Sequence, residues 1–272
     1  MSDFKTKTPS PEWRHQTTGA ELLQWAGWLA LTAFFLFCWQ LMTQDTIWSF
    51  VYDAPAQGED ILARAFPPRW SYLPQLLIPL WDTLNMATLG TLGGTLIAVP
   101  IAFLAARNTT PAAAFIRPIA LLIIVSSRSI NSLIWALLLV SILGPGMMAG
   151  TIAIALRSIG FIGKLLYEAI EEIDETQVEA VMATGASQLQ VIDYAIVPQI
   201  LPSLFGITVF RWDINIRESA ILGLVGAGGL GLNLQSSLNM LAWPQITIIF
   251  LVILLTVVVS EWVSAVVRKA IT

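Results

Sequence analysis

Long apolar runs separated by polar stretches dominate this 272-residue chain. Each complete run is long enough, at a rise of about 1.5 Å per residue, to cross a hydrocarbon core of roughly 30 Å. The pattern therefore predicts an all-α integral membrane protein with about six transmembrane helices. The expected spans are 22–42, 83–106, 119–143, 148–166, a fifth that begins near Leu204 and ends in the glycine-rich stretch 223–231, and 244–267.

The polar stretches divide the chain further. A polar tail, 1–21, precedes the first, peripheral span, and a long connection, 43–82, follows it with acidic and aromatic residues typical of a membrane interface. Within this connection the apolar segment 73–80 is interrupted by Pro74 and Pro79, and we expect it to lie along the membrane surface. The remainder, 83–272, is the predicted core domain. In its first span Gly90-x-x-x-Gly94 is a pattern for close helix packing.

Basic residues indicate the orientation, because cytoplasmic loops of membrane proteins carry an excess of Lys and Arg. With the N-terminus inside, the outer side would hold only Arg64 and Arg69. The inner side would hold Lys5, Lys7, Arg14, Arg107, Arg117, Lys164, Arg268 and Lys269. Both termini and the acidic loop 167–202 are therefore predicted to be cytoplasmic.

Composition agrees with a membrane protein and excludes several functions. The chain is 56% hydrophobic and only 12% charged, and its net charge of -4 argues against a nucleic-acid partner. Cys38 and His15 are single residues of their kinds, so no disulfide framework or metal site is expected, and no catalytic residue is assigned. The glycines of 226–231 fit a dinucleotide-binding pattern but follow a membrane helix instead of a strand, so we interpret them as a flexible turn on the outer side.

Four arginines fall inside the expected spans, where charge is costly and usually marks a cavity, a partner or a pathway. Asp213 and Arg217 are four residues apart and share a helix face. Arg128 and Arg157 have no acidic neighbour in the sequence, which predicts a net positive interior suited to a small anion. The alternative is that the arginines hold helices together through backbone carbonyls. The candidate pathway residues are Ser127, Arg128, Asn131, Arg157, Arg211, Asp213, Arg217 and Glu218.

The acidic loop 167–202 predicts two short helices. The first contains Glu179 and Ala180 and is expected to end at Gly185 in a left-handed conformation. The second is expected to run over 187–194 and to stop before Pro198, because proline lacks a backbone N–H and restricts the residue before it.

This loop resembles the EAA loop of ABC importer permeases, with Glu179-Ala180-Val181, then Gly185, then Ile196-Val197-Pro198. Val181, Ala195 and Val197 depart from the family pattern of Glu-Ala-Ala, Gly and Ile-x-Leu-Pro. Further stretches are similar to phosphonate-type permeases and extend the resemblance over most of the chain from the second span onward. They are 126–136, 160–165, 211–219 and 223–231.

The resemblance implies a type I ABC importer permease fold in the bacterial inner membrane, and two copies of the permease, expected to be a homodimer. It also implies a cytoplasmic ATPase dimer that carries ATP and Mg, a periplasmic substrate-binding protein, and a phosphorus oxyanion such as phosphonate or phosphite as substrate. No cofactor and no ATP hydrolysis are expected on this chain, which lacks a P-loop. Coupling to the ATPase would then involve Glu179, Ala180, Gly185 and Pro198.

Two alternatives remain open at this point. A permease for another substrate, for example an amino acid such as methionine, would share the fold and the EAA loop. An ATP-independent anion channel or secondary carrier would use the intramembrane charges directly. Carriers of that class normally contain internal repeats, and the sequence has no clear pair of matching halves.

Overall fold

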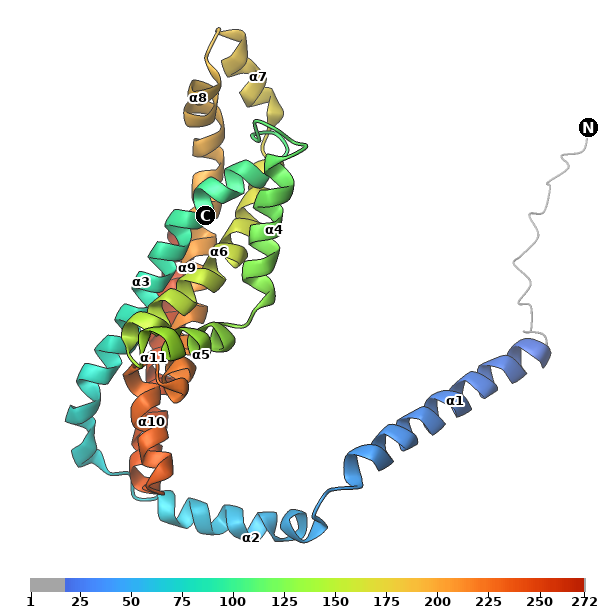
Figure 1. Ribbon diagram of the computed structural model, residues 1–272, viewed down its shortest axis with the longest axis vertical. Helices are drawn as coiled ribbons and strands as arrows, with labels where there is room; N and C mark the ends of the chain where they lie inside the picture. The colour runs from blue at the N-terminus through green and yellow to red at the C-terminus, as the bar shows by residue number, and fades with distance from the viewer. Residues whose placement is uncertain (1–17, 272) are drawn as a thin grey trace, which may run out of the picture. The chain divides into compact units, whose positions relative to one another are not determined.

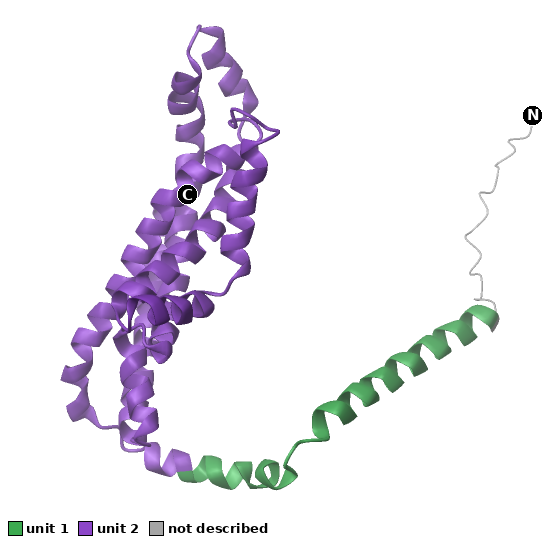
Figure 2. Ribbon diagram, in the orientation of Figure 1, with its two compact units in different colours: residues 1–60 green, residues 61–272 purple. Residues whose placement is uncertain are grey.

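The computed structural model describes residues 18–271, and these residues are helical without a strand (Figure 1). The chain divides into two units, Met1–Asp60 and Ile61–Thr272 (Figure 2). The helices are α1 Thr18–Thr43, α2 Trp48–Ala65, α3 Leu73–Ala105, α4 Ile116–Ser129, α5 Ser132–Leu143, α6 Met147–Glu171, α7 Glu175–Ala183, α8 Gln188–Val191, α9 Val197–Leu222, α10 Gly229–Asn239 and α11 Trp243–Ile271. The described part also contains two short 3-10 turns, at Trp70–Tyr72 and Gly223–Val225, and a π-helical turn at Ile192–Ile196.

The predicted all-α membrane architecture is confirmed. Among the described residues, 5 helices are long and apolar enough to cross a membrane, and a bent pair, α4 with α5, raises the number to 6. The first of these spans, in α1, has none of its apolar window buried within the chain, as expected for a helix surrounded by lipid or by another subunit. The basic residues of the tail, Lys5, Lys7 and Arg14, lie outside the described residues.

The segment 73–80 does not form a separate surface element, in contrast to the prediction. It is the beginning of α3, which continues without interruption to Ala105. Pro74 lies in the first turn of the helix, where a missing N–H is tolerated, and Pro79 is accommodated inside it. The Thr83 hydroxyl donates to the Pro79 carbonyl at 2.8 Å, and Leu76 is only 1% exposed. Packing therefore outweighs the helix-breaking tendency of the two prolines.

Helices α3 and α6 form the centre of the second unit, and they meet through the predicted small-residue pattern. A Cβ atom added to Gly90 would lie 2.6 Å from Ile154 Cγ2, and one added to Gly94 would lie 2.7 Å from Ser158 Cβ. The two glycines therefore allow a backbone approach that a larger residue would block. Met86, Ile154 and neighbouring small residues fill this contact and are almost fully buried.

The third predicted span is not a straight helix. Helix α4 ends at Ser129, and α5 begins at Ser132 at an angle of 88° to it. Ile130 is extended, with φ -92° and ψ 130°, and the Asn131 side chain caps α5 by accepting from the Leu133 N–H at 3.2 Å. Asparagine is a favoured N-cap residue, so the local sequence ends one helix and starts another where an apolar run alone suggested continuity.

The helix predicted to stop before Pro198 also continues. The Val197 N–H donates to the Ile192 carbonyl, five residues earlier, so the chain passes through a π-helical turn before Pro198. Pro198 then lies in the first turn of α9, where no N–H is required. The Gln199 side chain donates to the Ala195 carbonyl at 2.8 Å. The chain is consequently helical from α8 to the end of α9.

The glycine-rich stretch 226–231 forms the predicted turn, but the turn is packed against the rest of the unit and leads into a helix, α10. Gly226 and Gly228 have φ values of +90°, in the left-handed region that glycine tolerates best. A Cβ atom on Gly231 would lie 2.1 Å from the Ala220 carbonyl oxygen, so the backbones of α9 and α10 are in direct contact. Within the second unit, α10 lies at the end opposite to α7 and α8 (Figure 1).

Candidate functional site

The bend between α4 and α5 is held against α6 by a serine and a glycine. The Ser127 hydroxyl donates to the Leu156 carbonyl and accepts from the Gly160 N–H at 2.8 Å. A Cβ atom on Gly160 would lie 2.6 Å from the Arg128 nitrogen, so only glycine permits this crossing. The polar residues that follow Ser127 are thereby placed beside the middle of α6.

Arg157 of α6 is the centre of a polar cluster in a largely apolar pocket at this bend. Its Nη1 atom lies 2.9 Å from Glu218 Oε1 of α9, 3.3 Å from Asn131 Oδ1 and 3.2 Å from Ser132 Oγ. The pocket has a volume of about 420 Å³. It is lined by Asn131, Ser132, Leu133, Ile134, Arg157, Glu218, Ile221 and Leu222. Below, these residues are called the outer pocket.

Arg157 has no acidic neighbour in the sequence, but the fold gives it an acidic partner. Glu218 lies 61 positions further along the chain, so only the packing of α9 against α6 brings the two side chains together. The Arg157 side chain keeps 28% of its surface exposed, against 15% for Glu218. The guanidinium can thus still be reached from the pocket while its charge is partly compensated.

Arg211 is buried behind the same carboxylate. Its side chain is 2% exposed, with Nη2 3.4 Å from Glu218 Oε2 and Nε donating to Ser158 Oγ at 3.2 Å. The guanidinium carbon also lies 5.1 Å from the centre of the Phe161 ring, a favourable cation–π distance. Arg211 thus contacts Glu218 within α9, and Ser158 and Phe161 on α6. It holds the two helices together, as in the alternative explanation of the arginines.

Asn215, one turn along α9, extends this buried polar contact to α3. Its Nδ2 atom donates to Thr91 Oγ1 at 2.7 Å and to Ser158 Oγ at 3.0 Å. Hydrogen bonds of this kind satisfy polar groups where water is excluded, and they fix the relative positions of the helices. Thr91 carries no charge or motif, so the sequence analysis did not identify it.

Asp213 and Arg217 form the ion pair that their spacing predicts, on a different face of α9. Asp213 is buried and also accepts from Ser260 Oγ of α11 at 2.8 Å, whereas the Arg217 side chain is 45% exposed. Neither residue lines the outer pocket. Ser260, another residue that the sequence analysis missed, makes this pair a link between α9 and α11.

Arg128 does not join the other candidate residues. It is exposed and has no hydrogen-bond or ion-pair partner among residues 18–271. It lines a separate pocket of about 210 Å³ between α4 and α6. The predicted pathway residues thus fall into four places: the outer pocket with Arg211 behind it, the link to α11, the pocket of Arg128, and the contact of Ser127 with α6.

The acidic loop forms a compact protrusion at one end of the second unit. Asp174 caps α7 by accepting from the Thr176 N–H at 3.0 Å, and Gly185 follows the helix with φ +81°, as predicted. Ser187 and Gln190 form a capping box at the start of α8. Hydrogen bonds from the Thr176 side chain and backbone hold the pKa of Asp174 below its ordinary value. These local bonds give the loop a defined shape.

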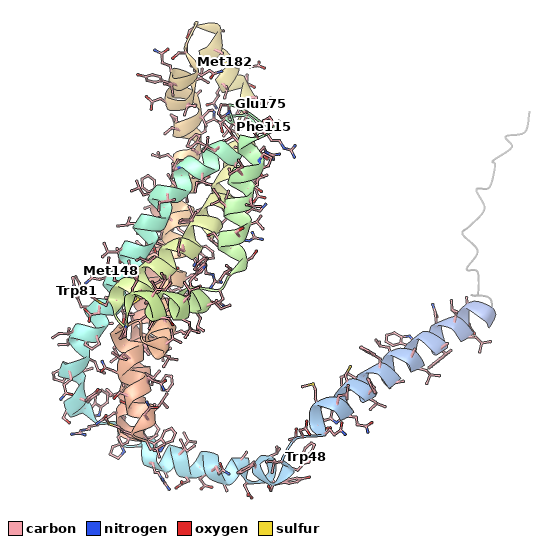
Figure 3. The ribbon with its side chains drawn as sticks, in the orientation of Figure 1. Trp48, Trp81, Phe115, Met148, Glu175 and Met182 are labelled. Atoms are coloured by element: carbon pink, nitrogen blue, oxygen red, sulfur yellow. The ribbon has the colours of Figure 1, made fainter. Side chains whose placement is uncertain are left out.

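The protrusion exposes apolar side chains. Met182 is 51% exposed, Leu189 79% and Tyr194 70%. Figure 3 shows Met182 on this protrusion. Glu179 and Ala180 are exposed on α7, and Pro198 is exposed at the start of α9. A cleft of about 460 Å³ lies beside Gly185 and is lined by Val181, Thr184, Gly185, Ala186, Gln190 and Tyr194. An exposed cluster of large apolar residues on a polar loop is typical of a surface that contacts another protein.

Comparison with known proteins gives one family and a consistent set of relatives. Residues 98–272 match the family described as binding-protein-dependent transport system inner membrane component. The phosphite transport system permease protein PtxC of Stutzerimonas stutzeri is 37% identical over 77% of this chain and 76% of its own length. The phosphate-import permease protein PhnE of Mycolicibacterium smegmatis is 40% identical over 81% of this chain but only 42% of its own.

The fold also has a solved counterpart. An inward-facing conformation of the MetNI methionine ABC transporter matches with a TM-score of 0.65, covering 75% of this chain and 99% of that chain at 22% identity. At this identity the likeness concerns the fold alone. It agrees with the predicted type I importer permease architecture.

Proposed function

The chain belongs to the family of binding-protein-dependent transport system inner membrane components, and from this premise we propose that it is the permease through which a small phosphorus oxyanion, phosphite or a phosphonate, enters the cell. The observation that carries the choice of substrate class is Arg157, held by Glu218 at 2.9 Å in a pocket whose other walls are largely apolar. The names of the relatives, among them a phosphite and a phosphate permease, support the same class.

The donors of the outer pocket suit a tetrahedral oxyanion. A guanidinium presents N–H groups in a planar fork that matches two oxygens of a phosphorus centre. Asn131 Oδ1 and Ser132 Oγ accept from Arg157 Nη1. The Asn131 NH2 group and the Ser132 hydroxyl, once it turns from Asn131 Oδ1, can donate to an oxyanion. A pocket of about 420 Å³ accommodates a small anion with water around it.

Glu218 keeps the binding weak enough for transport. An entering oxyanion must compete with this carboxylate for Arg157, and Glu218 can retain Arg211 when Arg157 turns to the substrate. A pathway site has to release its ligand as well as bind it, as in channels with several weak sites. A second copy of the chain would enclose the pathway from the other side.

Energy must come from a partner, since this chain has no P-loop. We assign ATP and Mg to a cytoplasmic ATPase dimer that contacts the exposed side chains around Met182 and Leu189. ATP would bind one state of that dimer more tightly, and the continuous helix from α8 through α9 would carry the change to Glu218. A periplasmic binding protein would deliver the substrate to the outer side.

The test uses the full transporter, co-expressed with the genes that neighbour this one and reconstituted in liposomes. Arg157→Gln should reduce uptake of phosphite more than tenfold, and Arg157→Lys, which keeps the charge without the fork, should restore part of it. Arg107→Gln is the control, because that side chain is 76% exposed and does not line the outer pocket. Uptake in Arg157→Gln equal to that in the control would overturn the proposed site.

A second candidate substrate, methionine, is favoured by a relative named as a methionine import permease, which is 35% identical over 38% of this chain. Binding proteins loaded with phosphite, methylphosphonate or methionine would be compared by the ATP hydrolysis that each stimulates. Stimulation by methionine alone would replace the proposed substrate. Movement of anions by this chain alone in liposomes, without an ATPase, would instead indicate a channel or a secondary carrier.

A further inference from the structure

A second polar pocket lies between α4 and α6, on the side of the bend away from the outer pocket. It has a volume of about 210 Å³ and is lined by Leu121, Ile124, Val125, Arg128, Ser129, Lys164 and Tyr167. Below, these residues are called the inner pocket. Arg128 and Ser129 line the inner pocket, and Asn131 and Ser132 line the outer one, so the bend around Ile130 separates the two.

The inner pocket combines two cations and two hydroxyl groups. Lys164 Nζ donates to the Tyr167 hydroxyl at 2.7 Å and forms an ion pair with Glu168. Glu168 compensates Lys164, but no carboxylate pairs with Arg128 in the described part of the chain. The inner pocket therefore carries a net positive charge, and it presents donors to whatever enters it.

The inner pocket is formed by helices that are apolar enough to cross a membrane. Arg128 is near the end of α4, in the bent pair, and Lys164 lies near the predicted cytoplasmic end of the α6 span. Such groups face a water-filled cavity or a partner, because exposure to hydrocarbon is costly. The inner pocket is also lined by Leu121, Ile124 and Val125. Such apolar walls have a low dielectric constant, so they focus the field of Arg128 and Lys164 on the pocket.

The inner pocket is also aligned with the outer one. Arg157 and Lys164 are seven residues apart on α6, so they lie on the same face two turns from each other, about 10 Å along the helix. Gly160, where α4 crosses, lies between them. Since α6 leads directly into the protrusion that carries α7, Lys164 is closer than Arg157 to that end of the unit.

We propose that the inner pocket is a second oxyanion subsite, which the substrate occupies after passing the α4–α5 bend and before release. This inference rests on the proposed function and adds to it a site with its own binding residues, Arg128, Lys164 and Tyr167; the Ser129 hydroxyl lines this site but donates to the Val125 carbonyl. Two weak subsites in series let the anion move in short steps, so that no single site binds it too tightly for release. The ligand chemistry is a phosphorus oxyanion, and the headgroup phosphate of a lipid shares that chemistry.

The experiment measures protection of an introduced thiol, so it needs no transport. In a Cys38→Ser background of the full transporter in nanodiscs of neutral lipid, Ser129→Cys reports on the inner pocket and Ile134→Cys on the outer one. Phosphite should slow the modification of both thiols severalfold and saturably, relative to chloride at equal ionic strength. Lys164→Gln should remove the protection at position 129 only, Lys164→Arg should retain it, and Arg157→Gln should leave it intact.

The outcomes separate the two proposals. Protection at position 134 without protection at 129 would overturn the inner subsite and leave the proposed function standing. Protection at 129 alone would support the inner subsite and contradict the outer one, and protection at neither would overturn both. If anionic lipid without phosphite protects position 129 and phosphite adds nothing, the inner pocket holds a lipid headgroup, and the transport subsite is wrong.

Discussion

Arg157 on α6 and Glu218 on α9 form an ion pair with 2.9 Å between Nη1 and Oε1. The second oxygen of the same carboxylate lies 3.4 Å from Arg211, which is almost fully buried. One carboxylate therefore serves two guanidinium groups, one that faces a pocket and one that fixes α9 to α6. This arrangement connects the architecture of the helices to the site proposed for the substrate.

Removal of the Glu218 charge should destabilise the fold more than removal of the Asp213 charge. Glu218→Gln leaves the buried Arg211 without a counter-ion, and breaking a buried pair in this way costs about 3 kcal/mol or more. Asp213→Asn keeps an acceptor for Ser260, and its partner Arg217 is 45% exposed, so a loss of about 1 kcal/mol is expected. Unfolding of both variants in denaturing detergent would measure the difference, and equal losses would contradict this account.

The contact of α9 with α10 should tolerate no side chain at Gly231. In Gly231→Ala the new methyl group would overlap the Ala220 carbonyl, at 2.1 Å, and we expect a loss of about 2 kcal/mol or more. Gly206→Ala is the matched control, because its Cβ meets nothing within 4 Å and it lies inside α9. That substitution should stabilise the helix by about 0.5–1 kcal/mol. Thermal unfolding of the purified protein would show opposite shifts.

The effect of a substitution at Gly185 should depend more on the backbone conformation that the new residue tolerates than on the volume of its side chain. The residue has φ +81°, and a Cβ there meets nothing within 4 Å. Asparagine tolerates this conformation, whereas a β-branched residue costs about 1–2 kcal/mol. Gly185→Val should therefore lower the number of substrate molecules taken up per ATP hydrolysed severalfold, and Gly185→Asn should change it little. An equal loss in both variants would point to volume at a partner surface.

The cap of α7 should weaken in acid. The pKa of Asp174 in the folded loop is lowered by hydrogen bonds from the side chain and backbone of Thr176. A lowered pKa means that the cap stabilises the loop fully above the ordinary value of about 3.9, and that this contribution is lost as the pH falls through the lowered pKa. Hydrogen exchange of the α7 amides, corrected for intrinsic rates, should rise below about pH 4.

Asp174→Asn provides the control for this pH dependence. Asparagine remains a good N-cap but cannot titrate, so α7 exchange in the variant should vary little over the same range. Persistence of the acid effect in Asp174→Asn would assign it to another group.

Sequence alone was sufficient for the fold class and for the local elements whose signals lie within a few residues. The apolar runs predicted the spans, Gly90 and Gly94 predicted a close helix contact, and Gly185 predicted the end of α7. The Asp213–Arg217 pair followed from a spacing of four residues. In each case the determining interaction is made along one helix or by one backbone conformation, so neighbouring residues contain the information.

Tertiary structure decided the features that depend on packing between distant segments. The same prolines that predicted breaks at 73–80 and before Pro198 are accommodated in α3 and α9. Glu218 reaches Arg157 because α9 packs on α6, and Arg128 lines the pocket of Lys164 because α4 packs on α6. An ion pair inside a membrane depends on which helix faces lie together, and that arrangement follows from the packing of all the spans at once.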